Sequence, residues 1–301
     1  MKIGMVGLGR MGMNMGLRLL QKGHGVVAFN RTAEKTRKLM EQGAEGSFSL
    51  AELVSKLPAP RVVWLMLPAG KVVDDHIEAL RDILDPGDII VEGGNSHYRD
   101  DIRRAEGLKS SGIHYLDAGV SGGIWGLQVG YCTMIGGDSE DVVRLEPVFR
   151  DLAPENGYLH CGPTGAGHYV KMIHNGIEYG MMEAYGEGFA LLESSPYRDH
   201  LDYAAVAGLW NQGSVIRSWL LELLEKAFAE DGRLNGITGH VEDSGEGRWT
   251  VDEAVANGVS APVIALALFQ RFQSRDPNSF ANRVLAALRR EFGGHAVKKA
   301  E

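Results

Sequence analysis

A glycine-rich motif near the start of the chain constrains the fold more than any other feature. Residues 2–6 form a short apolar strand, residues 7–12 read Gly-Leu-Gly-Arg-Met-Gly, and residues 13–21 continue as a helical run. The first glycine permits a tight turn, the second a close approach to a pyrophosphate, and the third close packing of helix on strand. The helix N-terminus favours phosphate charge. The motif predicts a dinucleotide-binding Rossmann domain, with cofactor contacts from Gly7, Leu8, Gly9, Arg10, Met11 and Gly12.

The second strand, predicted at residues 25–29, ends in Asn30, Arg31 and Thr32. A site for NAD usually has an acid at this position, which accepts a hydrogen bond from the ribose 2′-hydroxyl, and this chain has none there. Arg31 can instead pair with a 2′-phosphate, and Thr32 can cap the next helix while donating to the same phosphate. These three residues therefore favour NADP. The alternative is an arginine that stacks on adenine and tolerates either cofactor.

The pattern of apolar residues changes near residue 160. Before that point strands alternate with helices, which is typical of a doubly wound sheet with ligands at the carboxyl ends of its strands. Further strands are predicted at 61–67, 88–92, 113–117, 131–135 and 157–161. Later helices are predicted at 167–194, 201–209, 213–228, 250–257, 261–272 and 278–291. We therefore predict an α/β Rossmann domain with a mostly parallel sheet over residues 1–162, followed by an all-α domain over residues 163–301.

One predicted helix carries a polar face suited to proton transfer. Residues 165–179 read Gly-Ala-Gly-His-Tyr-Val-Lys-Met-Ile-His-Asn-Gly-Ile-Glu-Tyr. At about 100° per residue, one face carries a potential base, an imidazole, an amide and a potential acid, namely Lys171, His174, Asn175 and Glu178. A hydride transfer followed by carbon protonation needs one group to take a proton and another to give one. The alternative is an ordinary solvated helix face.

The same helix carries two packing signals. Gly176 within the polar face costs roughly 1 kcal/mol of helix stability relative to alanine, so we expect a close approach to the backbone there. A neighbouring apolar stripe is predicted to pack inward and consists of Val170, Ile173, Ile177 and Met181.

Loops that follow the predicted strands carry further polar groups. Leu67 and Pro68 end one strand and are expected to line the cofactor. The loop at residues 93–96 places the Asn95 amide and a serine hydroxyl beside the expected nicotinamide. Ser121, Gly122 and Gly123 offer a hydroxyl and successive backbone N–H groups, which suit a carboxylate. For the loops at 93–96 and 121–123, the alternative is an ordinary glycine and serine turn.

Composition restricts the classes of function. The net charge of −8, with no basic run interleaved with aromatic residues, argues against a nucleic-acid surface. The sequence has no stretch resembling a membrane span or a secretory leader, which predicts a cytoplasmic protein. The two cysteines lack metal-ligand spacing, and we expect no metal.

At these residues the chain resembles the decarboxylating 6-phosphogluconate dehydrogenases, in their short form. The resemblance runs nearly end to end and rests on GLGRMG at 7–12, NRT at 30–32, EGGNS at 92–96, VSGG at 120–123, the stretch at 165–179, EGRWT at 246–250 and the Arg…His spacing at 289–295. The wider 3-hydroxyacid dehydrogenases share the glycine loop, Ser-Gly-Gly, and the lysine with an asparagine four residues on. They lack the His-Asn…Glu-Tyr pattern, which favours the narrower family.

The resemblance implies oxidative decarboxylation of 6-phosphogluconate to ribulose 5-phosphate with NADP, or NAD, as oxidant. Lys171 would act as general base and then acid, and Glu178 as general acid. Substrate would be held by Asn95, Ser121, Gly122, Gly123, His174, Asn175, Tyr179, Arg248, Thr250, Arg271, Arg289 and His295, the last two from a partner subunit. A homodimer or a dimer of dimers is implied. The alternatives are a non-decarboxylating 3-hydroxyacid dehydrogenase and a catalytically silent NADP-binding sensor.

Overall fold

The chain divides into two compact units, Met1–His174 and Asn175–Glu301. The computed structural model describes residues 1–276, 278–293, 296 and 298. Helix α8 (Ala166–Glu193) begins in the first unit and continues into the second. Within the described part of the chain, no helix is both long enough and apolar enough to cross a membrane.

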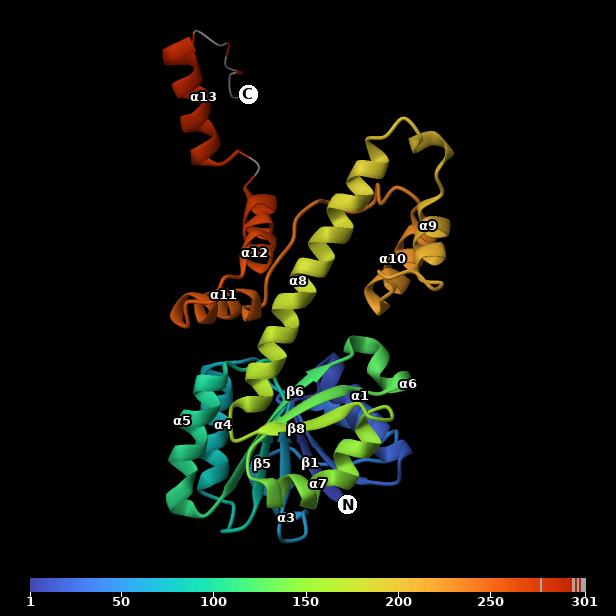
Figure 1. Cartoon of the computed structure of the whole chain (residues 1–301). Coiled ribbons are helices and arrows are strands. Elements are labelled where there is room, and N and C mark those ends of the chain that lie inside the picture. Colours follow the sequence, from blue (N-terminus) through green and yellow to red (C-terminus); the bar gives the residue numbers. More distant parts are fainter. Residues whose placement is uncertain (277, 294–295, 297, 299–301) are drawn as a thin grey trace. The chain divides into compact units, whose positions relative to one another are not determined.

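The first unit is built on an eight-stranded sheet in the order β3-β2-β1-β4-β5-β6-β7-β8. Strands β1, β5, β6 and β8 are labelled in Figure 1. Neighbouring strands are parallel except β6 and β7, which pair antiparallel. The strands are β1 (Lys2–Val6), β2 (Gly25–Phe29), β3 (Glu45–Gly46), β4 (Val62–Leu65), β5 (Ile89–Glu92), β6 (His114–Ser121), β7 (Cys132–Gly136) and β8 (Tyr158–Gly162). The predicted α/β fold with a mostly parallel sheet is confirmed.

Helices cover both faces of this sheet because its strands alternate their side chains between two apolar cores. Ile3 and Met5 of β1 join one core, whereas Val6 joins the other. The first core also contains side chains of α1 (Arg10–Gln21), α2 (Ala33–Met40) and α7 (Ser139–Leu152). The second contains side chains of α3 (Leu50–Ser55), α4 (Lys71–Arg81) and α5 (Tyr98–Leu108). The short helices η1 (Lys109–Ser111), η2 (Gly123–Trp125) and α6 (Gly126–Val129) complete the unit.

The strand order brings the predicted ligand loops to one edge of the sheet. Strand β1 lies between β2 and β4, so chain connections diverge on either side of it. In open α/β sheets, ligands bind at such a switch point, outside the carboxyl ends of the strands. The loops after β1, β2, β4 and β5 therefore open at the same edge.

The second unit is helical, as predicted. It contains the remainder of α8, then η3 (Arg198–His200), α9 (Tyr203–Trp210), α10 (Trp219–Glu230), α11 (Glu246–Ala256), α12 (Pro262–Arg275) and α13 (Phe280–Gly293). One buried cluster joins α8, α9 and α10 around Phe189, Tyr203 and Phe228. A second joins α8 and α12 around Tyr179 and Leu268.

Two predicted helix starts were wrong, and in both cases the residues before the helix set its start. The helix predicted from residue 213 begins at Trp219 instead, because Gly213 has a φ of +76° and the Ser218 hydroxyl caps the helix by accepting from Leu221 N–H. The helix predicted from residue 250 begins four residues earlier, directly after Gly245 with a φ of +105°.

The apolar stripe predicted to pack inward on α8 lies mostly outside. Val170 is 41% exposed and Ile177 is 52% exposed in the single chain. The helix packs instead through its glycines: a Cβ on Gly167 would lie 2.6 Å from the Gly136 nitrogen. Glycine permits a backbone-to-backbone approach that larger apolar side chains would prevent.

Candidate functional site

The loop after β1 has the shape that a dinucleotide pyrophosphate requires. Gly7 has a φ of +93°, and a Cβ there would clash with the Met66 carbonyl group. A Cβ on Gly12 would clash with the Gly7 carbonyl oxygen, so both positions need glycine for packing. A Cβ on Gly9, by contrast, would meet nothing within 4 Å. The backbone at Gly9, at the N-terminus of α1, is therefore open to a phosphate, and the loop fits the cofactor.

Asn30 holds this loop in place from the end of β2. Its side-chain oxygen accepts a hydrogen bond from Leu8 N–H at 2.9 Å, and its amide donates to the Thr32 carbonyl oxygen at 3.2 Å. The Leu8 side chain is buried in the core, so Leu8 can meet a cofactor only through its backbone. Asn30 therefore contributes as a support for the loop.

Arg31 and Thr32 are exposed beside that loop. Thr32 is the N-cap residue of α2, but its side chain makes no capping hydrogen bond, so the predicted cap is wrong. A capping hydroxyl is not needed at Lys35, because the Lys35 N–H already donates to the Thr32 carbonyl oxygen at 3.1 Å. In the first turn of α1, Arg10 is exposed and Met11 is packed against the core.

The loops after β4 and β5 lie against one another. A Cβ on Gly94 would lie 2.5 Å from the Leu67 carbonyl oxygen, so only glycine allows this approach. The Gly94 N–H donates to Glu92 Oε1 at 2.9 Å, which closes the turn. Leu67 is half-buried and Pro68 is exposed at this edge.

Lys171 and Asn95 are brought together at the same edge. Lys171 is 5% exposed, and its Nζ donates to Asn95 Oδ1 at 2.5 Å. Strand β6 passes so close to α8 that a Cβ on Gly119 would lie 2.8 Å from Lys171 Cγ. Asn95 itself is exposed. A buried amine is thus held by a side chain that solvent or a ligand can reach.

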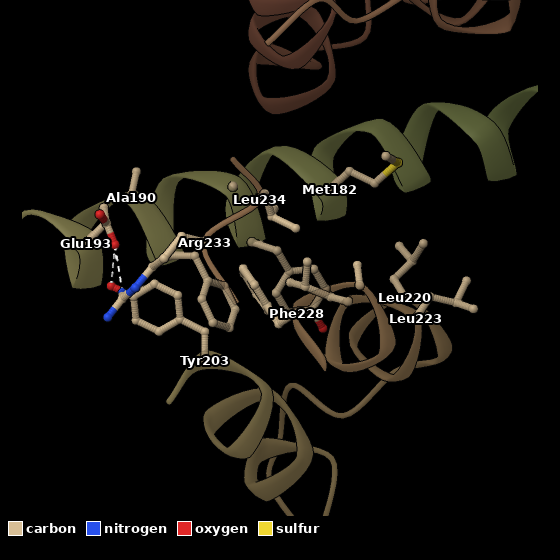
Figure 2. A pocket seen from close by; sticks show the side chains of 14 residues that line it. Met182, Ala190, Glu193, Tyr203, Leu220, Leu223, Phe228, Arg233 and Leu234 are labelled. Atoms are coloured by element: carbon tan, nitrogen blue, oxygen red, sulfur yellow. Dashed lines mark hydrogen bonds and ion pairs between the residues drawn. The ribbon is translucent and has the colours of Figure 1, made fainter. Parts of the chain in front are cut away.

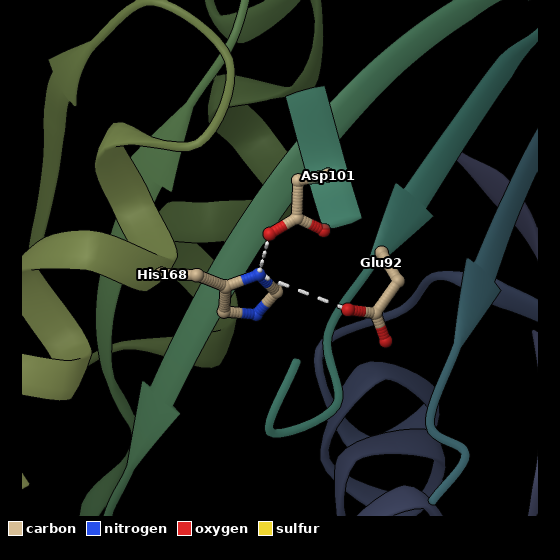
Figure 3. Close-up of side chains that lie close together, drawn as sticks. All are labelled: Glu92, Asp101 and His168. Atoms are coloured by element: carbon tan, nitrogen blue, oxygen red, sulfur yellow. Dashed lines mark hydrogen bonds and ion pairs between the residues drawn. The ribbon is translucent and has the colours of Figure 1, made fainter. Parts of the chain in front are cut away.

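A buried polar cluster lies one helical turn before Lys171 (Figure 3). His168 Nδ1 lies 2.7 Å from Asp101 Oδ2 and 3.7 Å from Glu92 Oε2. Its Nε2 donates to the Gly94 carbonyl oxygen at 2.9 Å. Asp101 also accepts a hydrogen bond from the Tyr115 hydroxyl at 2.7 Å. The ligand atoms of Glu92, Asp101 and His168 lie within 4.8 Å of one another, which also makes them a candidate metal cluster.

The charges of this cluster favour a protonated histidine. Burial lowers the pKa of His168, but the carboxylates of Asp101, Glu92 and Asp117 outweigh burial and raise the pKa to about 9. Burial raises the pKa of Glu92, and the His168 charge opposes this rise. Buried charges need such partners because desolvation otherwise disfavours them.

Asp117 on β6 fixes the start of α8. Its two carboxylate oxygens accept hydrogen bonds from Gly165 N–H at 2.6 Å and His168 N–H at 2.8 Å. These amides belong to the start of the helix, where backbone N–H groups have no partners within the helix itself. Burial raises the pKa of Asp117, and these two hydrogen bonds oppose the rise.

The loop after β6, which is predicted to bind a carboxylate, contains two glycines with positive φ. Gly122 has a φ of +136° and Gly123 a φ of +54°, and Ser121 ends the strand beside them. Asn14 of α1 donates to the Ile124 carbonyl oxygen at 3.3 Å. The predicted carboxylate loop is therefore tied to the helix that begins at the glycine-rich motif.

In the second unit, Glu246 gathers the residues around Asn175. The Glu246 carboxylate is buried, with 1% exposure, and accepts from Asn175 Nδ2 at 2.9 Å and from the Ser244 hydroxyl at 2.6 Å. A Cβ on Gly176 would lie 2.7 Å from Thr250 Cγ2, which confirms the predicted close approach. The Thr250 hydroxyl donates to the Glu246 carbonyl oxygen within α11.

Arginine side chains of this unit are held by aromatic rings and by one acid. The Arg271 guanidinium lies 3.5 Å from the Tyr179 ring centroid, a cation–π contact. Arg248 makes two hydrogen bonds to Asp243, at 2.8 and 2.9 Å, and Arg275 makes a third to the same carboxylate at 2.7 Å. These contacts hold the pKa of Asp243 well below its usual range. The arginines are thus oriented before any ligand binds.

The remaining predicted residues lie on α8 and in the C-terminal part of the chain. His174 and Glu178 are half-buried on α8. Arg289 is exposed on α13, and His295 lies outside the described residues.

Sequence reasoning missed several residues that support these groups. Glu92 and Glu246 lie within the motifs at 92–96 and 246–250, and His168 lies three residues before Lys171. Their positions in the sequence could therefore have identified them. Asp101 and Asp243 occur in ordinary charged helical and loop sequence, and only the fold brings each to the polar cluster of its own unit.

The second unit also has an apolar pocket. Figure 2 shows side chains of α8, α9 and α10 around a volume of about 580 Å³. At its rim, Arg233 pairs with Glu193 at 2.8 Å and lies 4.2 Å from the Tyr203 ring centroid. None of the predicted catalytic or binding residues lines it.

Comparison with known proteins matches both parts of the chain. Residues 2–162 match the NAD binding domain of 6-phosphogluconate dehydrogenase, and residues 167–298 match the C-terminal domain of that enzyme. The Haloferax volcanii protein named "6-phosphogluconate dehydrogenase, NAD(+)-dependent, decarboxylating" is 45% identical over 303 residues, 100% of both chains. The Bacillus subtilis protein YqeC, whose name assigns this enzyme provisionally, is 50% identical over 99% of this chain and 100% of its own.

Solved structures agree with the sequence matches. The Plasmodium falciparum 6-phosphogluconate dehydrogenase, described with NADP+ and with 6-phosphogluconate, has a TM-score of 0.83 and 30% identity, and the match covers 100% of this chain and 67% of that one. A Mycobacterium tuberculosis 3-hydroxyisobutyrate dehydrogenase has a TM-score of 0.73 at 24% identity, covering 96% of this chain and 99% of that one, and it shows the fold alone.

Proposed function

This chain belongs to the 6-phosphogluconate dehydrogenase family, and on that premise we propose that it converts 6-phosphogluconate to ribulose 5-phosphate and CO2 while reducing a nicotinamide dinucleotide. The observation that carries the proposal is the buried Lys171 amine, which donates to Asn95 at the carboxyl edge of the sheet. Such an amine can exchange a proton with a substrate hydroxyl bound at Asn95.

The cofactor would be held by the edge that the glycine-rich loop opens. Its residues are Gly7, Leu8, Gly9, Arg10, Met11, Gly12, Asn30, Arg31, Thr32, Leu67, Pro68 and Asn95. The oxidised nicotinamide, when bound, accepts a hydride from C3 of the substrate. We propose that residues 1–162 serve this binding and that residues 163–301 bind substrate and form a dimer.

Lys171 acts first as a base. In its neutral form it takes the proton of the C3 hydroxyl as C3 is oxidised to a ketone. Asn95, which accepts from the same amine, holds it in position. The Lys171 ammonium then donates a hydrogen bond to the new ketone and polarises it.

Loss of CO2 follows because the C3 ketone can accept the electron pair of the C1–C2 bond. The product is an enediol, and Glu178 donates a proton to the carbon that was C2 of the substrate, which becomes C1 of ribulose 5-phosphate. The carboxylate and hydroxyls of the substrate would be held by Ser121, Gly122, Gly123, His174 and Asn175. Its phosphate would be held by Tyr179, Arg248, Thr250 and Arg271.

We propose NADP as the preferred oxidant. The support is the exposed Arg31 at the end of β2, where this chain has no acid for a ribose hydroxyl. The names of relatives differ on this point: the Haloferax volcanii protein is named NAD(+)-dependent, and the Plasmodium falciparum structure is described with NADP+.

We further propose a homodimer in which Arg289 and His295 contribute to the partner's phosphate site. The support is α13, whose apolar side chains are largely exposed in the single chain: Phe280, Val284, Leu285 and Leu288. Exposed apolar faces of this kind mark contact surfaces.

The test follows NAD(P)H and CO2 together after addition of 6-phosphogluconate. Lys171→Met should abolish oxidation while binding of cofactor is retained, and Glu178→Gln should slow product formation at the protonation step. Near-normal turnover in either variant would contradict that residue's role, and NADPH without CO2 would indicate a simple 3-hydroxyacid dehydrogenase.

The dimer proposal has a separate test. Lys171→Met and Arg289→Ala subunits, each expected to be inactive alone, are co-expressed. If Arg289 acts on the partner, a mixed dimer has one site with both lesions and one with neither, so activity should reappear. Mixed dimers without activity would assign Arg289 to its own subunit or to no site.

A further inference from the structure

We propose that His168 is a positioning residue that holds the 93–96 loop, and with it Asn95, at hydrogen-bond distance from Lys171. The proposal rests on the proposed function for its catalytic consequence. Its structural part, that His168 holds the loop in place, is independent of the proposed function, because it uses only contacts between residues of the first unit.

Two hydrogen bonds make this connection. His168 lies on α8, three residues before Lys171, and its Nε2 lies 2.9 Å from the Gly94 carbonyl oxygen. A carbonyl oxygen can only accept, so Nε2 must carry the proton. Asn95 follows Gly94 directly, and its side chain accepts from Lys171. The ring therefore links the turn of α8 that bears Lys171 to the loop that bears its hydrogen-bond partner.

The ring itself has no freedom to turn. Asp101 of α5 lies 2.7 Å from Nδ1, and the Tyr115 hydroxyl fixes the other Asp101 oxygen at 2.7 Å. The backbone N–H of His168 is bound to Asp117. His168 is 1% exposed, and Asp101 is fully buried. A side chain fixed by several buried hydrogen bonds can hold a neighbouring reactive group in a single position and orientation. Apolar packing alone does not specify the position so narrowly.

The same atoms raise the alternative of a bound cation. Glu92, Asp101 and His168 offer three ligand atoms close together. The geometry favours a proton instead, because Nδ1 and Asp101 Oδ2 are at hydrogen-bond distance and Nε2 already serves Gly94. The charge balance agrees, since the surrounding carboxylates raise the pKa of His168 to about 9.

The experiment compares His168→Phe and the milder His168→Gln with a matched control, His24→Phe. His24 is also buried and lies 2.8 Å from a carboxylate, that of Asp151, but it directly precedes β2 at the amino edge of the sheet, whereas Asn95 follows β5 at the carboxyl edge. Each variant is also made in an Asn95→Ala background. Steady-state kcat, the KM for cofactor and the labelling rate of Lys171 by an amine-reactive ester, read by peptide mass spectrometry, are measured for all.

We expect His168→Phe to lower kcat by about 100-fold, as for a misplacement of about 1 Å. Lys171 labelling should rise, and His24→Phe should change neither quantity beyond about twofold. In the Asn95→Ala background the His168 substitutions should add little, because both act on the same contact.

Three results would overturn the proposal. The first is unchanged Lys171 labelling in folded His168→Phe. The second is an effect on kcat that adds fully to that of Asn95→Ala. The third is a stoichiometric metal in the purified protein that the His168 substitutions release, which would make the cluster a metal site. If wild type shows no turnover of 6-phosphogluconate, the proposed function fails, and the labelling measurements still decide the role of His168.

Discussion

Replacing Gly119 by alanine tests whether the reacting lysine depends on the close contact of α8 with β6. A Cβ at Gly119 would overlap the Lys171 Cβ and lie 2.8 Å from its Cγ and 3.1 Å from the Gly167 carbonyl oxygen. Carbon atoms in contact are normally about 3.5–4.0 Å apart, so the lysine stem must move by about 1 Å. Neither side can yield easily, because Gly167 itself lies against Gly136 and Asp117.

The displacement predicts two separate losses. Overpacking of this kind costs about 1–3 kcal/mol of unfolding free energy. A shift of about 1 Å in a catalytic group costs roughly 100-fold in turnover, equivalent to about 2.7 kcal/mol of activation free energy. Urea unfolding measures the first, and kcat with 6-phosphogluconate measures the second. Gly107→Ala is the control, because Gly107 lies in α5 where an added Cβ would meet nothing within 4 Å, and this variant should be neutral or slightly stabilising.

The reasoning would fail if Gly119→Ala kept turnover within about twofold of wild type while losing the expected stability. The strand and helix would then separate without moving the amine, and the position of Lys171 would not depend on this contact. Equal stability of the Gly119 and Gly107 variants would contradict the packing argument itself.

Three further predictions concern the cofactor, the buried histidine and the buried acid of the second unit. Arg31→Ala should weaken NADP binding far more than NAD binding, because it removes a charge-assisted phosphate contact, and equal losses in titrations would mean that Arg31 only stacks on adenine. The pKa of His168 is raised from 6.5 to about 9, so the stability it contributes is complete below pH 6.5 and is lost as pH rises through 9. Unfolding free energy should therefore fall by up to about 3 kcal/mol over that range, and His168→Phe should flatten the fall. Glu246→Leu should cost about 1–3 kcal/mol in urea unfolding, because the Asn175 amide and the Ser244 hydroxyl both lose the carboxylate that accepts from them; an unchanged midpoint would show that these two residues find other acceptors.

The sequence predicted the fold because its signals are local and repeated. Apolar strands followed by glycine-containing loops identify the sheet, and the strand at residues 2–6 followed by the glycine motif marks where it begins. The predicted strands lie within a few residues of the observed ones. The two-residue strand β3 has no periodicity to detect, so pairing with β2 alone defines it.

The packing of α8 could not be predicted in this way. Hydrophobicity indicated that Val170 and Ile177 would face inward, but the first turns of the helix bury His168, Lys171 and Met172. Burial of charged side chains depends on partners distant in sequence, such as Asp101, and no pattern on the helix itself reveals them.

The two buried acids, Glu92 and Glu246, show that a sequence motif can mark the place of a site without showing which of its residues hold the others in position. Glu92 begins one motif and accepts a hydrogen bond from the backbone of Gly94, and Glu246 begins another and accepts one from Asn175. Both acids are buried, at 0% and 1% exposure. Acids so enclosed have little access to a substrate, whereas their hydrogen bonds orient the residues beside them. We therefore infer that each acid orients its neighbours within its own unit, which agrees with the proposal that Lys171 and the half-buried Glu178 transfer protons.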